Sequence, residues 1–423
     1  MNIIDIITKK KNKEELSKEE IKYVIDNYLN DNIKDYQMSS LLMAIVLNGM
    51  CFEETYNLTE TMLNSGNVMD LSEINGIKVD KHSTGGVGDK TTLVVGPLVA
   101  SCGVPVAKMS GRGLGFTGGT IDKLESIEGF NTKISNKEFI NQVNNIKIAL
   151  VSQTENLVPA DKKIYALRDV TGTTESIPLI ASSIMSKKLA SGSDKILLDV
   201  KVGKGAFMKN IDSARELAKT MVKIGNRHGK ETIAILTNMN YPLGFTIGNS
   251  LEVIEAIDTL NGKGEKKFTD LCLLLASYMV SMGKNINIDK AVEEVKENFN
   301  NKKAYDKFKE LVINQNGDID NIPIENNVID IYSDKDGYIT DINTLSLANL
   351  CNDLGAGRKK KEDNINSKVG VKLLKTINDK VNTNDLLMKV YSSSDIDKNK
   401  FLESIIITKN NIPETKIVYE IIK

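Results

Sequence analysis

The stretch Lys81-His-Ser-Thr-Gly-Gly-Val-Gly-Asp-Lys90 joins a β-branched run at residues 77–80 to an apolar run at residues 91–101. This order predicts a strand, a glycine-rich turn and a helix. Such a turn directs backbone N–H groups and a helix N-terminus at one point, which favours an anion. The spacing matches neither the ATP-binding P-loop nor the dinucleotide pattern, so we expect phosphate rather than ATP. The alternative is a tight turn that binds nothing. The polar side chains available there are Lys81, Ser83, Thr84 and Thr92.

A second glycine-rich stretch, Ala107-Lys-Met-Ser-Gly-Arg-Gly-Leu-Gly-Phe-Thr-Gly-Gly-Thr-Ile-Asp-Lys-Leu-Glu125, again runs from a predicted strand into a predicted helix. Of the 30 glycines, 12 lie between Gly76 and Gly129, so backbone freedom is concentrated in the part of the chain that contains these two turns. Two such turns at neighbouring strand ends can converge on one anion. The second turn would add Lys108, Ser110 and Thr120 as donors.

Hydrophobic periodicity divides the chain into three parts. The first 65 residues predict three short helices, one of which begins with the capping box Ser17-Lys-Glu-Glu20. From about residue 67, five short strands (77–80, 104–109, 148–152, 196–200 and 232–236) alternate with helices, which is typical of α/β proteins. We expect a discontinuous all-helical domain (1–66 and 159–192), an α/β domain with a central mixed sheet (67–158 and 193–329) and a C-terminal α+β domain (330–423).

Charge and cysteine content narrow the class of protein. The 55 basic and 56 acidic residues leave a net charge of −1, so nothing draws the chain to nucleic acid or an anionic membrane, and we expect a small ligand. The four cysteines lie far apart without a CxxC pair, which favours a reducing, cytoplasmic location. The N-terminal stretch lacks the pattern of a secretory signal, and the longest uncharged stretch, residues 91–107, is interrupted by Gly and Pro and indicates buried core.

The quoted residues resemble the thymidine/pyrimidine-nucleoside phosphorylase family, most closely its bacterial pyrimidine-nucleoside branch. Ser110–Glu125 is similar to the family signature and Lys81–Asp89 to its phosphate loop. The similarity covers nearly the whole chain and continues in Pro159-Ala-Asp-Lys-Lys-Ile-Tyr-Ala-Leu-Arg-Asp-Val-Thr171, Ser182-Ser-Ile-Met-Ser-Lys-Lys188 and Gly355-Ala-Gly-Arg358. The resemblance implies a homodimeric transferase with no organic cofactor. Its reaction would be reversible phosphorolysis of pyrimidine nucleosides to free base and (2-deoxy)ribose 1-phosphate.

The resemblance also implies roles for individual residues. His82, Arg168 and Lys187 would be catalytic, and the base would be bound by Arg168, Ser183 and Lys187. Ser183 and Lys187 are four residues apart and share one helix face. The phosphate would be held by Lys81, Ser83, Thr92, Lys108, Ser110 and Thr120.

Two of these roles leave alternatives open. His82, with a reference pKa near 6.5, can donate a proton or a neutral hydrogen bond to the base, although a lone histidine is often structural. Arg168 can instead pair with Asp161 or Asp169, which are near it in sequence. Because base and phosphate groups fall on different domains, we expect domain closure before the reaction.

Two positions depart from the family pattern. Phe116 stands where a histidine is common, so only packing is left for it. Lys90 stands where a threonine is usual, and in the bacterial branch that threonine helps to bind K⁺. The potassium site would otherwise comprise Gly88, Leu243, Thr246 and Glu255. An ammonium group cannot coordinate K⁺, so either the Lys90 carbonyl serves or its side chain replaces the ion.

The sequence also bears on substrate preference and on rival functions. Lys108 occupies a position that is apolar in strict thymidine enzymes, and a cation near the sugar favours a 2′-hydroxyl, so we expect uridine, deoxyuridine and thymidine all to react. The alternative is a strict thymidine phosphorylase. A phosphoribosyltransferase of the anthranilate type would need an acidic pair for Mg²⁺, and the sequence has no convincing one. A non-catalytic nucleoside or phosphate sensor is a further alternative.

Overall fold

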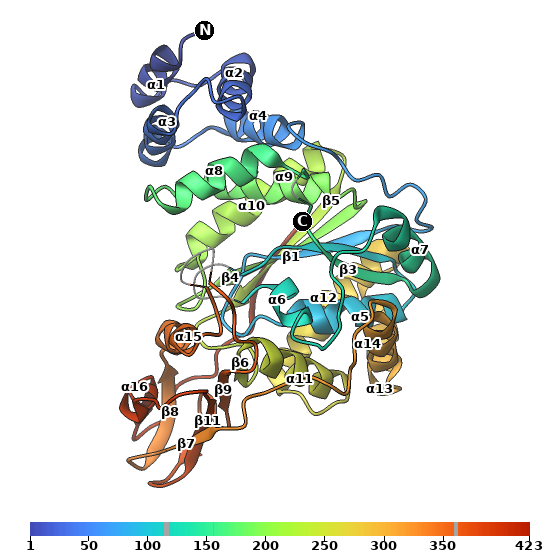
Figure 1. Cartoon of the computed structure of the whole chain (residues 1–423), viewed down its shortest axis with the longest axis vertical. Coiled ribbons are helices and arrows are strands. Elements are labelled where there is room, and N and C mark those ends of the chain that lie inside the picture. Colours follow the sequence, from blue (N-terminus) through green and yellow to red (C-terminus); the bar gives the residue numbers. More distant parts are fainter. Residues whose placement is uncertain (114–117, 155, 359–362) are drawn as a thin grey trace.

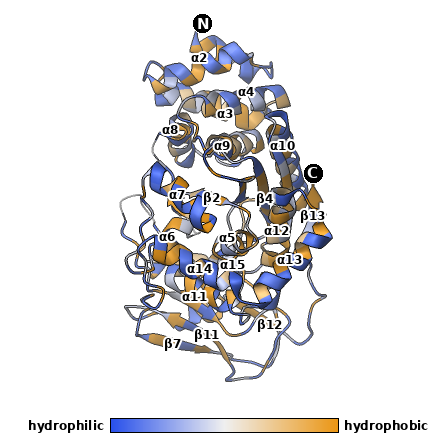
Figure 2. Cartoon of the chain, turned by 90° about the vertical axis from the view of Figure 1, so that its right-hand side faces the viewer, coloured by the Kyte–Doolittle hydropathy of each residue, from blue (hydrophilic) through white to orange (hydrophobic). Residues whose placement is uncertain are grey.

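The computed structural model describes residues 1–113, 118–154, 156–358 and 363–423. Phe116 and the lysine run 359–361 therefore lie outside the described residues. The molecule is elongated, with a helical layer at the N-terminal end, an α/β layer in the middle and a smaller β-rich part at the other end (Figure 1). A view turned by 90° shows the same succession from α2 to β7 (Figure 2).

The helical layer is built from two separate segments of the chain, as the sequence predicted. The capping box at Ser17 is present, and the buried face of the helix that it starts includes Ile21, Val24, Ile25 and Tyr28. The first segment has four helices rather than the three expected; the first is short, and only Ile3, Ile6 and Lys10 of it are buried, which makes its periodicity weak. The helices of this layer are α1 (Ile3–Lys11), α2 (Lys18–Leu29), α3 (Asp35–Asn48), α4 (Phe52–Leu63), α8 (Pro159–Asp169) and α9 (Ile177–Ala190).

A four-stranded sheet forms the centre of the α/β layer, in the order β1-β4-β5-β13. The first three strands are parallel, whereas β13 is antiparallel to β5, so the sheet is mixed. A second, two-stranded parallel sheet pairs β2 with β3. The strands are β1 (Val79–Ser83), β2 (Val106–Ser110), β3 (Ile148–Ser152), β4 (Lys195–Val202), β5 (Glu231–Asn238) and β13 (Val418–Ile422).

Helices cover both faces of the central sheet. Alternate residues of β4 enter different cores: Leu197 belongs to the cluster that includes α12, whereas Ile196 and Leu198 belong to the cluster that includes α10. Burial on both faces explains why β4 is apolar at nearly every position before Asp199. The helices of this layer are α5 (Thr91–Ser101), α6 (Thr120–Leu124), α7 (Asn136–Ile146), α10 (Ile211–Arg227), α11 (Asn249–Leu260), α12 (Lys266–Lys284), α13 (Ile288–Asn300) and α14 (Lys303–Asn314).

The C-terminal part contains two antiparallel sheets, β6-β9-β11-β7 and β10-β8-β12. Its extent differs from the expected 330–423 at both ends. Strand β6, from the α/β segment, joins the first of these sheets, and β13 returns to the central sheet, where the C-terminus lies (Figure 1). The elements are β6 (Thr246–Ile247), β7 (Val328–Tyr332), β8 (Gly337–Ile342), α15 (Thr344–Asp353), β9 (Gly370–Leu373), β10 (Lys380–Val381), β11 (Leu386–Tyr391), α16 (Lys398–Leu402) and β12 (Ile405–Thr408).

Two further findings concern the whole described chain. All four cysteines are free thiols. No single described helix has the length and apolar character to cross a membrane; α12 and α13 pass that test only as a pair, and they are bent by 119° from one another.

Candidate active site

A cleft of about 870 Å³ lies between the helical layer and the α/β layer. Its volume falls within the range of small-molecule sites. Both layers contribute to its walls, including β1, α5 and β2 on one side and α8 and α9 on the other. The predicted catalytic, phosphate-binding and base-binding residues all line it: Lys81, His82, Ser83, Thr92, Lys108, Ser110, Thr120, Arg168, Ser183 and Lys187.

The phosphate side is built from the ends of β1 and β2 and from the helices that follow them. Gly85 has φ +91°, a conformation that favours glycine, and its N–H donates to Ser83 Oγ at 3.2 Å. Among the described residues, the hydroxyls of Thr92, Ser110 and Thr120 have no hydrogen-bond partner. These three groups are therefore available to an anion.

Lys81 and Ser83 are used differently from what the sequence suggested. The Ser83 hydroxyl donates to Asp89, and the Lys81 ammonium donates to Thr91 Oγ1 and lies 3.4 Å from Asp199. Burial opposes the charge of Asp89, but Lys201 and Lys81 outweigh it and hold the pKa of Asp89 far below its usual value. Lys81 and Ser83 thus stabilise the first glycine-rich turn through Thr91 and Asp89. Their direct contact with phosphate stays a prediction.

A buried charged triad lies between the two sides of the cleft. Asp80 Oδ1 is 3.1 Å from Lys108 Nζ, and Asp80 Oδ2 is 2.6 Å from Lys188 Nζ. Burial opposes ionisation of Asp80, yet the two lysines lower its pKa to about 2. Burial also lowers the pKa of Lys108 to about 7, against the opposing effect of Asp80. Lys108 therefore lines the cleft, as predicted, but Asp80 already holds its ammonium.

His82 lies on β1, two residues after Asp80, and its side chain is half-buried. Desolvation, reinforced by the ammonium groups of Lys188 and Lys108, holds the pKa of His82 well below its ordinary value. The imidazole is consequently neutral at pH 7. Of the two roles considered for His82, this geometry favours a neutral hydrogen bond over donation from an imidazolium.

The base side is formed by α8 and α9. Lys187 Nζ bonds to Asp161 Oδ2 at 2.7 Å and to Ser183 Oγ at 3.1 Å, and its side chain is 27% exposed, so it reaches the cleft. Its ammonium also lies 5.6 Å from the centre of the Tyr165 ring. The expected sharing of one helix face by Ser183 and Lys187 is confirmed. Tyr165 was missed as an individual residue, and Asp161 was named only as a possible partner of Arg168, although the stretch Pro159–Thr171 contains both.

Arg168 is buried where α8 meets α9. Its guanidinium donates to three backbone carbonyls, those of Thr173 (3.0 Å), Thr174 (2.9 Å) and Leu179 (3.3 Å). Asp161 pairs with Lys187 rather than with Arg168. Arg168 therefore holds the segment between α8 and α9, and the two remaining N–H groups of its fork are left for a ligand.

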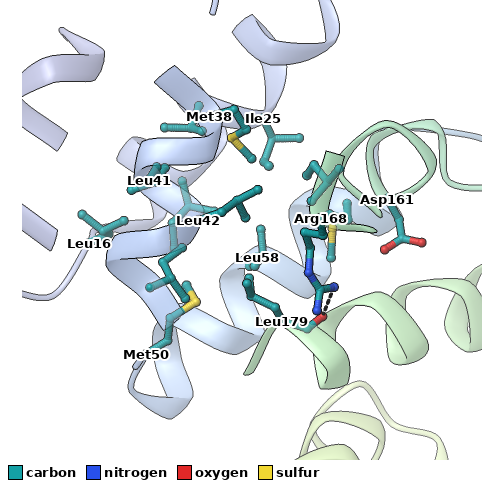
Figure 3. A pocket seen from close by; sticks show the side chains of 15 residues that line it. Leu16, Ile25, Met38, Leu41, Leu42, Met50, Leu58, Asp161, Arg168 and Leu179 are labelled. Carbon is teal, nitrogen blue, oxygen red and sulfur yellow. Dashed lines mark hydrogen bonds between the residues drawn. The ribbon is translucent and has the colours of Figure 1, made fainter. Parts of the chain in front are cut away.

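Behind Arg168 lies a small apolar cavity of about 30 Å³ inside the helical layer. Figure 3 shows leucine and methionine side chains from the N-terminal helices facing Arg168, which reaches the Leu179 carbonyl. A space of this size holds at most about one water molecule, so it is no substrate site. It does place the arginine between an apolar core and the cleft.

The residues predicted to bind potassium lie close together, but they surround the side chain of Lys90. The Lys90 ammonium lies 2.5 Å from Leu243 O, 3.3 Å from Thr246 O and 2.8 Å from Glu255 Oε2. Gly88 adjoins the same two carbonyls, since a Cβ there would lie 2.9 Å from each. Of the two alternatives for Lys90, the geometry matches replacement by the side chain. Elsewhere among the described residues, no group of three or more His, Cys, Asp or Glu side chains can hold a metal.

The C-terminal part also reaches the cleft. Arg358 Nη2 lies 3.0 Å from Asp122 Oδ1, which Arg112 Nη1 approaches at 3.2 Å. The other Asp122 oxygen accepts from the Gly113 N–H at 2.6 Å. The stretch Gly355–Arg358 thus contacts the carboxylate that fixes the second glycine-rich turn.

Comparison with known proteins places the chain in a class. The "Glycosyl transferase family, helical bundle domain" model matches residues 4–66, and the "Glycosyl transferase family, a/b domain" model matches residues 75–305. Fold and cleft thus define a glycosyl transferase with a helical bundle. A third model, "Pyrimidine nucleoside phosphorylase C-terminal domain", matches residues 338–408.

Individual relatives narrow the class to one family. The chain is 51% identical over 430 residues to the pyrimidine-nucleoside phosphorylase of Geobacillus stearothermophilus, with 99% of both chains covered. It is 52% identical over 400 residues to that of Bacillus subtilis (strain 168), with 93% of this chain and 92% of the relative covered. The chain belongs to the pyrimidine-nucleoside phosphorylase family. The predicted family and fold class are confirmed.

One solved structure shares the fold. The crystal structure of anthranilate phosphoribosyltransferase from Thermus thermophilus matches with a TM-score of 0.59 at 16% identity, covering 73% of this chain and 98% of that one. At this identity the likeness concerns the fold alone.

Proposed function

We propose that this protein catalyses reversible phosphorolysis of pyrimidine nucleosides, giving free base and (2-deoxy)ribose 1-phosphate. The observation that carries the proposal is a single cleft with unpartnered hydroxyls on one side and the Lys187 ammonium on the other. Membership of the family supports the same reaction. Phosphate is the co-substrate, and the reaction needs no organic cofactor.

The cleft can perform this chemistry by electrostatics alone. A phosphate oxygen bonds to C1′ of the sugar while the bond from C1′ to the base breaks, and its electron pair leaves with the base. Thr92, Ser110 and Thr120 orient the phosphate, with Lys81 and Ser83 supporting the turn. Lys187 stabilises the negative charge that develops on the base, and neutral His82 donates a hydrogen bond to it. Arg168 and Ser183 orient the pyrimidine edge.

Ultraviolet absorbance tests the proposal directly. Uridine or thymidine incubated with the protein should change absorbance only when phosphate is present, because cleavage requires phosphate as the attacking group. Cleavage that requires pyrophosphate and Mg²⁺ in place of phosphate would favour the phosphoribosyltransferase alternative. Binding without turnover would favour a sensor.

We also propose that the two sides of the cleft close on each other before the reaction. The phosphate groups lie on the α/β layer and the base groups on α8 and α9, so reactants bound to separate layers must be brought together. An engineered disulfide that holds the layers apart should abolish turnover and leave phosphate binding intact. Full turnover in the locked protein would exclude closure as a required step.

We further propose broad specificity for uridine, deoxyuridine and thymidine, with strict thymidine phosphorolysis as the alternative. Lys108 lines the cleft, where its ammonium can donate a hydrogen bond to a 2′-hydroxyl. Lys108→Met should lower the ratio of the uridine rate to the thymidine rate, while Asp80 keeps Lys188 as a partner. Thr120→Val is the matched control, because loss of a phosphate donor should slow both substrates equally. An unchanged ratio in Lys108→Met would refute the role of Lys108.

The assembly and location are proposals of the same kind. We expect a homodimer, as the family resemblance implies, and light scattering of the purified protein measures this. The four free thiols support a reducing, cytoplasmic location.

A further inference from the structure

We propose that Lys90 supplies the chain with a tethered monovalent cation, so that the protein neither binds nor requires K⁺ at this position. The Lys90 ammonium has three N–H donors and no acceptor. Leu243 O, Thr246 O and Glu255 Oε2 lie at 2.5, 3.3 and 2.8 Å from Lys90 Nζ. The two carbonyls accept hydrogen bonds from the ammonium and the carboxylate pairs with its charge, so the oxygens that would surround a potassium ion are already occupied.

The surroundings are built for one positive charge. The Lys90 side chain is fully buried and Glu255 is 6% exposed, so their charges are compensated inside the protein rather than by water. The Phe268 ring, whose centre lies 5.0 Å from the ammonium, adds a favourable cation–π contact. A potassium ion at these carbonyls would place a second buried positive charge beside Lys90, opposite a single carboxylate. Such an arrangement is unfavourable at low effective dielectric.

The acceptors themselves are held in place. Glu255 accepts from Phe245 N at 2.6 Å, from Thr246 N at 2.8 Å and from Thr246 Oγ1 at 2.5 Å. Leu243 N donates to Val87 O at 3.1 Å. The segment that carries the two carbonyls therefore has a defined position even before the ammonium is counted.

Lys90 connects this segment to the phosphate side of the cleft. It is the N-cap residue of α5 and directly follows Asp89, which orders Ser83 and Thr91. Thr246 also begins β6, which pairs with β9 of the C-terminal part. The ammonium thus links the phosphate turn, α11 and the C-terminal sheet through one covalently attached charge. Because it cannot dissociate, the position of the turn should not depend on the salt present.

The experiment compares thermal unfolding of the full chain in chloride salts of K⁺, Na⁺ and choline at equal ionic strength. The wild-type midpoint should be the same in all three salts. Lys90→Thr should unfold at lower temperature in choline, and K⁺ should raise its midpoint in a saturable way, as expected for a ligand that binds the folded state. Crystals soaked in Tl⁺ should show an anomalous peak between Leu243 and Glu255 in Lys90→Thr and none there in the wild type.

Lys10→Thr is the matched control. Lys10 pairs with Glu54 at 2.7 Å in the helical layer, and both side chains are buried, so this variant loses a comparable ion pair elsewhere. Its loss of stability should be equal in all three salts. A K⁺-specific rise in the wild-type midpoint or a Tl⁺ peak beside Lys90 would overturn the proposal. So would equal K⁺ rescue of both variants, or no K⁺ rescue of Lys90→Thr. If Lys90→Thr does not fold, the wild-type salt series and Tl⁺ soak decide alone.

Discussion

Replacing Lys187 with methionine should lower kcat for uridine phosphorolysis by about 10²- to 10³-fold, the usual effect of removing one donor that stabilises charge in a transition state. Lys187 is the ammonium of the base side that reaches the cleft, and Asp161 and Ser183 hold it in place. Methionine keeps the length and apolar stem of the side chain. The affinity for phosphate should stay near that of the wild type, because the phosphate donors lie on the other layer. Steady-state kinetics and phosphate titration measure both quantities.

The leaving group provides a sharper control. In 5-fluorouridine the electron-withdrawing fluorine already stabilises the departing base, so less depends on Lys187. The loss of kcat in Lys187→Met should therefore be smaller for 5-fluorouridine than for uridine. Equal losses for both nucleosides would mean that Lys187 positions the helix rather than stabilising charge. The Asp161→Asn variant should show a weaker form of the same pattern, since it releases Lys187 without removing its charge.

Local sequence was sufficient for most of the elements. The predicted helix at 91–101 and strand at 148–152 match α5 and β3 residue for residue, because each is an apolar run that begins directly after a lysine and ends at a serine. The glycine-rich turns pointed to the cleft for the same reason. By contrast, the antiparallel pairing of β13 with β5 joins residues that are 181 to 188 positions apart, and no local pattern encodes it.

The buried charges show why part of the site could not be predicted from the sequence. Asp80, Lys108 and Lys188 come from β1, β2 and α9. The local sequence around each of them does not predict its pairing with the other two. The cluster around Lys90 differs, because the family resemblance already implied that Leu243, Thr246 and Glu255 lie at one site. What the structure added was the direction of the ammonium. Residue type and family pattern thus predicted which side chains line the cleft, whereas their pairing required the fold.

The Asp80 triad leads to the largest expected effect on stability. Asp80→Ala should lower the free energy of unfolding by roughly 3–5 kcal/mol, the usual result of removing one partner from a buried ion pair. Lys108 and Lys188 would then face each other without a counter-charge. Urea unfolding monitored by circular dichroism measures the change. In the triple variant Asp80→Ala/Lys108→Met/Lys188→Met, much of the loss should return, because no uncompensated charge remains.

The pH dependence separates this charge effect from a cavity. In the wild type the depressed pKa of Asp80 contributes stability that is complete above about pH 4 and is lost as the pH falls towards 2. In Asp80→Ala, Lys108, whose pKa burial already lowers to about 7, loses the carboxylate that favours its charged form, so its folded pKa falls further below the unfolded value. In the wild type the lowered pKa of Lys108 already makes stability rise with pH between about 7 and 10, and in Asp80→Ala this rise should begin below pH 7. A cavity alone would lower stability equally across this range. A profile parallel to that of the wild type, or a triple variant no more stable than Asp80→Ala, would therefore show that the three charges do not act as one unit.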